Sequence, residues 1–230
     1  ELAQYFTLEQ IKQNEEGITD TTPDPALVEM FNNMIDEMFD YGRFILNKKK
    51  DKPENDLLSA IANAKIEGED LSQEFLDGSW LLIVFAGNDT TRNTMSGGIK
   101  LLNENPQQKQ LFLDNFERVT GLINETVRCV STVIHMRRTT LEETIIGDQK
   151  IGPFEKIALW YGAANRDPEI FDDPDKFNIM RTNADQHLAF GIGIHTCLGK
   201  PVALMQLREC FSQFLSRFPD YQLTGDWKVA

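Results

Sequence analysis

Residues 190–199 read Phe190-Gly191-Ile192-Gly193-Ile194-His195-Thr196-Cys197-Leu198-Gly199. The dipeptide Lys200-Pro201 follows, and because Pro favours the first turn of a helix, a helix is predicted to begin directly after this stretch. The positive end of a helix dipole stabilises a nearby anion. The position of Cys197 just before that helix therefore favours a thiolate, the form of cysteine that ligates metals.

The other residues of this stretch fit the same purpose. Gly191, Gly193 and Gly199 permit backbone conformations that are closed to other residues, and they would let amide N–H groups point at the sulfur. Phe190 would shield the sulfur from water. The alternative is a structural cysteine, because free cysteine is among the most buried residue types. The combination of Phe, two Gly, a basic residue, Cys and Gly favours the metal ligand.

This ten-residue pattern resembles the haem-binding loop of the cytochrome P450 family at every defining position. The resemblance implies that Cys197 is the ligand of the iron in haem b, and that Phe190, Gly191 and Gly199 shape the loop around it. His195, two residues before the cysteine, would contact a haem propionate. A thiolate ligand pushes electron density toward the iron and favours cleavage of the O–O bond of dioxygen.

A second motif, Ala86-Gly87-Asn88-Asp89-Thr90-Thr91, lies within a long predicted helix. Gly and β-branched Thr are poor helix formers, so their presence in a helix interior suggests a function. The Thr90 hydroxyl is placed to hydrogen-bond to the carbonyl of Ala86, and Gly87 would leave room for a ligand. A helix start capped by Asp89 or Thr90 is the alternative.

This second motif resembles the acid–alcohol pair of the P450 family. The resemblance implies that Asp89 and Thr90 are the catalytic residues, which deliver protons while the O–O bond is cleaved. It also implies that Ala86 and Gly87 border the haem.

Glu125 and Arg128 are three residues apart, so they lie on one face of a predicted helix. They form either an ordinary surface pair or, by resemblance, the buried Glu-x-x-Arg ion pair of the family, to which we assign no catalytic role. Many family members add a third member, an Arg placed where this chain has Lys176. Lys cannot make the bidentate contact of Arg, so Arg166 and Arg181 are the candidate substitutes.

A pair of arginines follows in His135-Met136-Arg137-Arg138-Thr139. By position, Arg138 resembles the family's Arg that binds a haem propionate. Arg137 is the alternative, and a solvated basic pair without a ligand is also open.

Helical periodicity dominates the chain, which predicts a mainly α fold. The predicted helices are 25–46, 56–64, a long one capped by Asp70 that reaches Leu102, one from Pro106, 116–130, and one from Pro201 that Pro219 ends. Short strands are predicted over 132–159 and a structured loop over 165–181. The resemblance implies the C-terminal portion of a cytochrome P450 fold, with a long central helix, small β elements and the haem-thiolate loop. Residues 1–230 would form a single domain that lacks the N-terminal part and the last strands.

Composition excludes several classes of protein. Hydrophobic residues make up 41% and charged residues 26%, as in globular proteins. The net charge of −13 argues against nucleic acid or an anionic membrane as the main partner. The sequence contains no apolar run of the length that a membrane anchor needs. Three cysteines without paired spacing favour a reducing location, and we expect the cytoplasm.

The resemblance implies a monooxygenase that inserts one atom of O2 into a C–H bond of a hydrophobic substrate, with electrons from a ferredoxin-type donor. Residues 86–98 and 135–139 look like those of bacterial alkane and fatty-acid terminal hydroxylases, and sterol side-chain terminal hydroxylases are the alternative. Cys129 and Thr132 depart from that pattern, because those enzymes usually carry Trp and Pro there. The candidate pocket wall is apolar: Leu82, Phe85, Ala86, Val133 and Ile134.

Three other functions are alternatives to a monooxygenase. A peroxide-driven hydroxylase of the same fold commonly lacks the Asp-Thr pair, and a non-catalytic haem-thiolate protein needs no such pair. A haem-free helical protein would have to carry four motifs in family order by chance.

Overall fold

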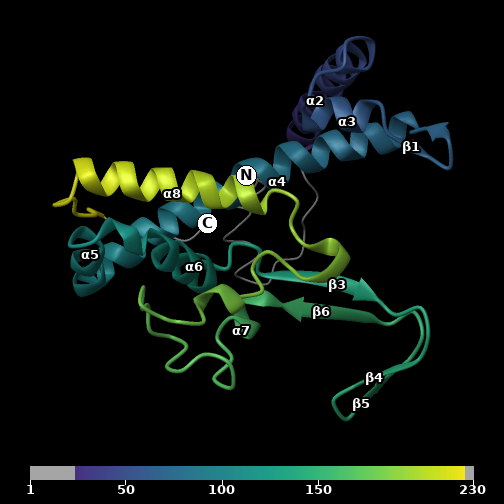
Figure 1. The fold of residues 1–230 in the computed structure, drawn as a ribbon. Helices are drawn as coiled ribbons and strands as arrows, with labels where there is room; N and C mark the ends of the chain where they lie inside the picture. The colour runs from purple at the N-terminus through teal and green to yellow at the C-terminus, as the bar shows by residue number, and fades with distance from the viewer. Residues whose placement is uncertain (1–23, 226–230) are drawn as a thin grey trace. The chain divides into compact units, whose positions relative to one another are not determined.

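The structure, a computed structural model, describes residues 24–225 and is predominantly helical (Figure 1). The mainly α fold predicted from the sequence is confirmed. The described residues divide into two compact units, 24–85 and 86–225. The single domain predicted over 1–230 stays a prediction, and its residues 1–23 and 226–230 lie outside the described part of the chain.

The first unit begins with helix α2 (Pro25–Asp51), which the Asp24 carboxylate caps by accepting a hydrogen bond from the Ala26 amide at 2.9 Å. The helix is five residues longer than predicted. Lys48, Lys49 and Lys50, which lie beyond the predicted end of the helix, form its last turn, where cations interact favourably with the helix dipole. Helix α3 (Leu57–Ala62) follows, capped by Asp56.

The predicted cap of the long helix is wrong. Asp70 belongs to the short strand β2 (Glu69–Asp70), which pairs with β1 (Lys65–Ile66), and its carboxylate forms ion pairs with Lys50 and Lys65. The Ser72 hydroxyl instead accepts a hydrogen bond from the Phe75 amide at 3.2 Å, and helix α4 runs without a break over Gln73–Glu104. This continuity excludes the alternative of a helix start at Asp89 or Thr90.

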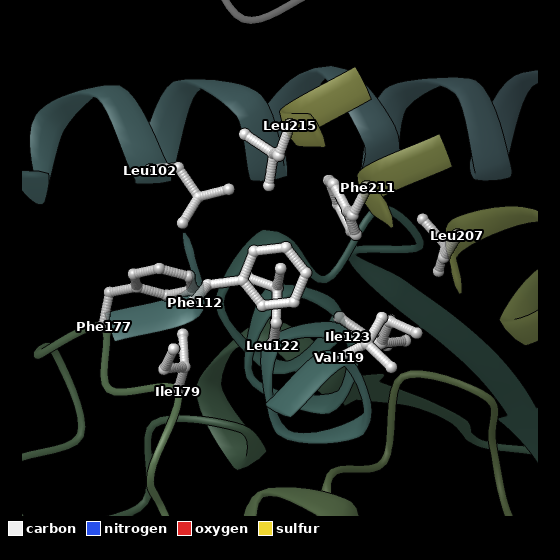
Figure 2. Close-up of a cluster of buried hydrophobic side chains, with 11 residues drawn as sticks. Leu102, Phe112, Val119, Leu122, Ile123, Phe177, Ile179, Leu207, Phe211 and Leu215 are labelled. Atoms are coloured by element: carbon white, nitrogen blue, oxygen red, sulfur yellow. The ribbon is translucent and has the colours of Figure 1, made fainter. Parts of the chain in front are cut away.

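The second unit is built around a cluster of buried side chains. They come from the end of α4, α5 (Pro106–Leu113), α6 (Val119–Val130), α8 (Lys200–Arg217) and the irregular segment that precedes α8. Figure 2 shows Leu102, Leu122, Phe211 and Leu215 directed toward one another beside Phe112. Each of these five side chains is fully buried, which contributes roughly 1.5–3 kcal/mol apiece. The cluster fixes α4, α6 and α8 as the frame of this unit.

Gly98 lets these three helices approach closely. A Cβ atom at this position would lie 2.4 Å from Cζ of Phe211 on α8 and 2.8 Å from Cγ2 of Thr126 on α6. Neither distance is possible without displacing a neighbour, so this mid-helix glycine serves packing rather than flexibility.

The predicted strands between α6 and the irregular segment are confirmed. Strand β3 (His135–Thr139) pairs antiparallel with β6 (Lys156–Trp160), and β4 (Thr144–Ile146) forms a hairpin with β5 (Gln149–Ile151) at the far end of the same ribbon (Figure 1). The short helix α7 (Tyr161–Ala164) follows β6. Within residues 24–225, the 3₁₀ turns are η2 (Phe116–Arg118), where helix 116–130 was expected to begin, η3 (Ala184–Gln186) and η4 (Gly193–His195). Across residues 24–225, every helix is too short or too polar to cross a membrane.

Candidate functional site

A cavity of about 280 Å³ lies within the second unit. Its walls come from α4 beyond Ala86, the loop after α6, strand β3, the loop that carries Cys197 and the first turns of α8. Eight residues that the sequence predicts for the site line it: Ala86, Gly87, Thr90, Phe190, Gly191, His195, Cys197 and Gly199. Two predicted haem-site or catalytic residues, Asp89 and Arg138, do not. Of the apolar wall predicted from the sequence, Ala86 and Val133 line the cavity and Ile134 does not, while Leu82 and Phe85 belong to the first unit.

The loop that carries Cys197 folds back on itself. The Cys197 amide donates to the carbonyl of Phe190 at 2.8 Å, and the Gly191 amide donates to that of Leu188 at 2.8 Å. Gly191 and Gly193 have positive φ angles, +68° and +72°, which L side chains rarely adopt. The predicted need for glycine is therefore confirmed at these two positions.

Gly199 departs from that expectation. It is the N-cap of α8 with φ −78°, a conformation open to any residue, so the prediction of special backbone geometry is wrong there. A Cβ atom at Gly199 would lie 3.8 Å from the Cys197 sulfur, an ordinary contact. Gly199 belongs to the site because it lies beside the sulfur and lines the cavity, and not because of its φ angle.

Among the three cysteines, all of them in the described residues, Cys197 alone lines the cavity. Burial raises the pKa of the Cys129 thiol to about 11, and burial also raises the pKa of Cys210. Both therefore remain protonated near neutral pH, and a protonated thiol is a poor metal ligand. Cys197 is exposed and lies three residues before α8.

On helix α4, the Thr90 hydroxyl donates to the carbonyl of Ala86 at 2.8 Å, as the sequence predicted. The Asp89 carboxylate is engaged outside the cavity. It accepts hydrogen bonds from Arg92 at 2.9 Å and from Asn93 at 3.0 Å, and its side chain is about half exposed. The structure thus brings Thr90 to the cavity and leaves Asp89 beside it.

Strand β3 discriminates between the two candidate arginines. Side chains alternate between the faces of a strand, so Met136 and Arg138 share one face and Arg137 lies on the other. Met136 lines the cavity. This alternation favours Arg138 over Arg137 as the side chain directed toward a group in the cavity.

The Glu125–Arg128 pair is fully buried, so the surface-pair alternative is wrong. Nε and Nη2 of Arg128 each donate to a carboxylate oxygen of Glu125 at 2.8 Å, a bidentate contact. Burial alone would lower the pKa of Arg128, but the hydrogen bond to Glu125 holds that pKa above its ordinary value. Nη1 of Arg128 donates to the backbone carbonyls of Asn165 and Pro174. The pair therefore anchors the irregular segment to α6.

Arg181 is the third member of this network. Its Nε lies 3.1 Å from Oε2 of Glu125, and its side chain is only 6% exposed. Lys176, at the position of the usual Arg, pairs with Asp173 at the surface and contributes only its carbonyl, which accepts from Arg128 and Arg181. Arg166 donates to the carbonyl of Cys129 and does not reach Glu125.

We expect Arg181→Met to lower the free energy of unfolding by about 2–3 kcal/mol, because it removes charged hydrogen bonds to the buried Glu125 carboxylate. The matched control, Lys176→Met, should change stability little, since its ion pair is exposed. Denaturation by urea measures both. Equal losses for the two variants would mean that Lys176, and not Arg181, completes the network.

Several residues that line the cavity were not predicted from the sequence. Thr94 follows Thr90 by one helical turn, and Met136 precedes Arg138 by the two-residue period of a strand, so periodicity could have found both. Val202 and Gln206 lie one helical turn apart on the α8 face that begins at Gly199. Tyr161 also lines the cavity, and no sequence signal points to it.

The sequence model of the cytochrome P450 family matches residues 24–220. The chain belongs to the cytochrome P450 family. Membership implies a haem held by a cysteine thiolate, and the residues present fit that group: Cys197 offers its sulfur to a cavity whose other contributions are mainly apolar side chains, glycines and hydroxyls.

Three bacterial P450s illustrate the similarity. Linalool 8-monooxygenase of Pseudomonas putida is 35% identical over 83% of this chain and 47% of its own length. Steroid C26-monooxygenase of Mycolicibacterium smegmatis is 33% identical over 90% and 51%, respectively. Methyl-branched lipid omega-hydroxylase of Mycobacterium bovis is 34% identical over 88% and 48%. The chain thus spans about half the length of the curated relatives it matches.

The fold comparison agrees. The crystal structure of the P450 CYP109E1 from Bacillus megaterium in complex with testosterone matches with a TM-score of 0.81 and 29% identity, over 99% of this chain and 63% of that one. The P450 fold predicted from the sequence, as a portion of the whole, is confirmed.

Proposed function

We propose that this chain is the haem-thiolate portion of a monooxygenase that inserts one atom of O2 into a C–H bond of a hydrophobic substrate. The observation that carries the proposal is that Cys197 and Thr90, which are far apart in the sequence, line one cavity. A thiol suited to ligate haem and a hydroxyl suited to handle protons are the two groups that this chemistry needs from the protein.

Cys197 would ligate a b-type haem, whose oxidising chemistry consumes O2, two electrons and two protons and places one oxygen atom in the substrate and one in water. Phe190, Gly191 and Gly199 would surround the sulfur, and Ala86 and Gly87 would border the haem. His195, in the cavity, and Arg138, on the cavity-facing side of β3, would bind the propionates.

Thr90 and Asp89 would divide the handling of protons. The Thr90 hydroxyl donates its hydrogen to Ala86, so its lone pairs are left to accept a hydrogen bond from a proton donor in the cavity. Asp89 is half exposed and can exchange protons with solvent. To pass a proton inward, its carboxylate must first leave Arg92 and Asn93.

Thr90→Ala is expected to lower the yield of product per O2 consumed by on the order of 10²-fold, since positioned proton transfer contributes that much or more. Ser96→Ala is the matched control, because the Ser96 hydroxyl makes the same contact with the carbonyl four residues earlier but is exposed. Oxygen consumption, peroxide release and product are measured together. An unchanged yield in Thr90→Ala would show that Thr90 does not deliver protons, whereas the absence of product from the wild-type protein would favour the non-catalytic alternative.

For the substrate, we propose an alkane or fatty acid that is hydroxylated at its terminal carbon. Similarity to a lipid omega-hydroxylase supports this choice, and similarity to a steroid C26-monooxygenase keeps a sterol side chain as the second candidate. Val133 and Met136 give the cavity apolar surface. A methylene group is worth only about 1–3 kcal/mol, so the apolar wall does not define chain length.

The electrons would come from a ferredoxin-type donor, and the proposed location is the cytoplasm, where unpaired cysteines stay reduced. The experiment adds alkanes, fatty acids and sterols in turn to the full-length haem protein. It records the shift of the main haem absorption band and then identifies products by mass spectrometry. Product formed with peroxide alone, but not with O2 and electrons, would identify a peroxide-driven hydroxylase instead.

A further inference from the structure

The two walls of the cavity that carry Thr90 and Cys197 are far apart in the sequence, and the loop after α6 lies between them. Two consecutive residues of this loop, Ser131 and Thr132, make hydrogen bonds in opposite directions. Thr132 contacts α4, and Ser131 contacts the irregular segment that leads to Cys197.

On the α4 side, the hydroxyl oxygens of Thr132 and Thr94 are 2.8 Å apart, and both residues line the cavity. The Thr94 hydroxyl also lies 2.8 Å from the carbonyl oxygen of Thr90. A carbonyl only accepts, so the one hydroxyl hydrogen of Thr94 points at Thr90, and Thr132 must be the donor to Thr94. The direction of this chain of hydrogen bonds is thereby fixed, from Thr132 through Thr94 to Thr90.

On the other side, Ser131 adopts a left-handed conformation with φ +44°, which is unfavourable for a residue with a side chain. Its hydroxyl donates to the carbonyl of Arg128 and accepts from the side-chain amide of Asn165, each at 2.8 Å. Asn165 is fully buried, and its side-chain oxygen accepts from the Leu188 amide at 2.6 Å. Leu188 lies two residues before Phe190, whose carbonyl accepts from the Cys197 amide.

We infer that Ser131 and Thr132 are positioning residues that set the spacing between Thr90 and Cys197 across the cavity. Thr132 acts through Thr94 on the helical turn of Thr90, and Ser131 acts through Asn165 on the loop of Cys197. The inference rests on the proposed function and adds to it two residues that touch neither reacting atom.

The first test compares Thr132→Val, which keeps the shape and removes the hydroxyl, with Thr132→Ser, which keeps the hydroxyl. In the full-length haem protein, Thr132→Val should lower product per O2 consumed about two- to tenfold, the range expected for one hydrogen bond. Thr132→Ser should restore it. Thr140→Val is the matched control, because the Thr140 hydroxyl bonds to Gly152 outside the cavity.

The second test uses Ser131→Gly, because glycine accepts the positive φ angle and only the hydroxyl is lost. The expected result is a lower fraction of protein with the thiolate-type absorption band of the reduced carbon monoxide complex at about 450 nm. Thr132→Val should leave that band unchanged. The two variants therefore distinguish the effect of Thr132 on Thr90 from the effect of Ser131 on the loop of Cys197.

Thr132→Val with the yield of the Thr140→Val control, or Ser131→Gly with a wild-type band, would overturn the inference. So would a Thr132→Ser variant as poor as Thr132→Val, since a hydroxyl at position 132 would then not restore the yield. A wild-type protein without the thiolate band or without product would instead overturn the proposed function, before any variant is compared.

Discussion

Cys197→Ala is expected to abolish the thiolate-type absorption band that the reduced protein shows with carbon monoxide at about 450 nm, together with all substrate oxidation. The sulfur of Cys197 is the thiol that lines the cavity, and Ala offers the iron no ligand. The measurement is an absorption spectrum of the full-length protein, followed by product analysis.

Cys210→Ala is the matched control for this result. Cys210 is a half-buried thiol on α8 whose pKa burial raises, so its removal should leave the band in place. If Cys197→Ala keeps the band, another thiol is the ligand. If the wild-type protein holds haem through histidine, the proposed oxygen chemistry is wrong.

Glu125→Gln is expected to lower the free energy of unfolding by about 3–5 kcal/mol, the cost of leaving a buried charge without its partner. Two guanidinium groups, those of Arg128 and Arg181, contact this one carboxylate, and they are 0% and 6% exposed. Gln keeps the shape of Glu but cannot offset either charge. Denaturation by urea or heat gives the loss directly.

The control for this second variant is Asp173→Asn, which breaks the exposed ion pair with Lys176 in the same segment and should leave stability nearly unchanged. Because Arg128 also holds the carbonyl of Asn165, Glu125→Gln should additionally weaken haem retention. Wild-type stability in Glu125→Gln would show that the buried network does not hold this segment to α6.

The loop of Cys197 was predictable from sequence because its chemistry is local. Positive φ at Gly191 and Gly193 and a helix directly after the cysteine are properties of neighbouring residues. The hydrogen bond from Thr90 to Ala86 was predictable for the same reason, since both residues lie on one helical turn.

The wrong cap at Asp70 and the features that the sequence left undecided have other causes. Asp70 is a residue type that often caps helices, but its carboxylate forms ion pairs with Lys65 and with Lys50, which lies twenty residues earlier. Its backbone belongs to strand β2. Asp89 lies beside a cavity residue, yet its contacts with Arg92 and Asn93 turn it outward. The periodicity of a sequence does not predict the backbone conformation of an irregular segment. It therefore could not show that Arg181, and not Arg166, contacts Glu125.

The place of Arg181 in the Glu125 network bears on how such chains are recognised. A search for an arginine immediately before Phe177 would score this protein as incomplete, although both oxygens of the carboxylate have a guanidinium partner. The arginine that contacts Glu125 lies five positions after Lys176, the position at which such a search would look. A definition based on which group contacts the carboxylate, rather than on fixed spacing along the chain, would include this chain and others built the same way.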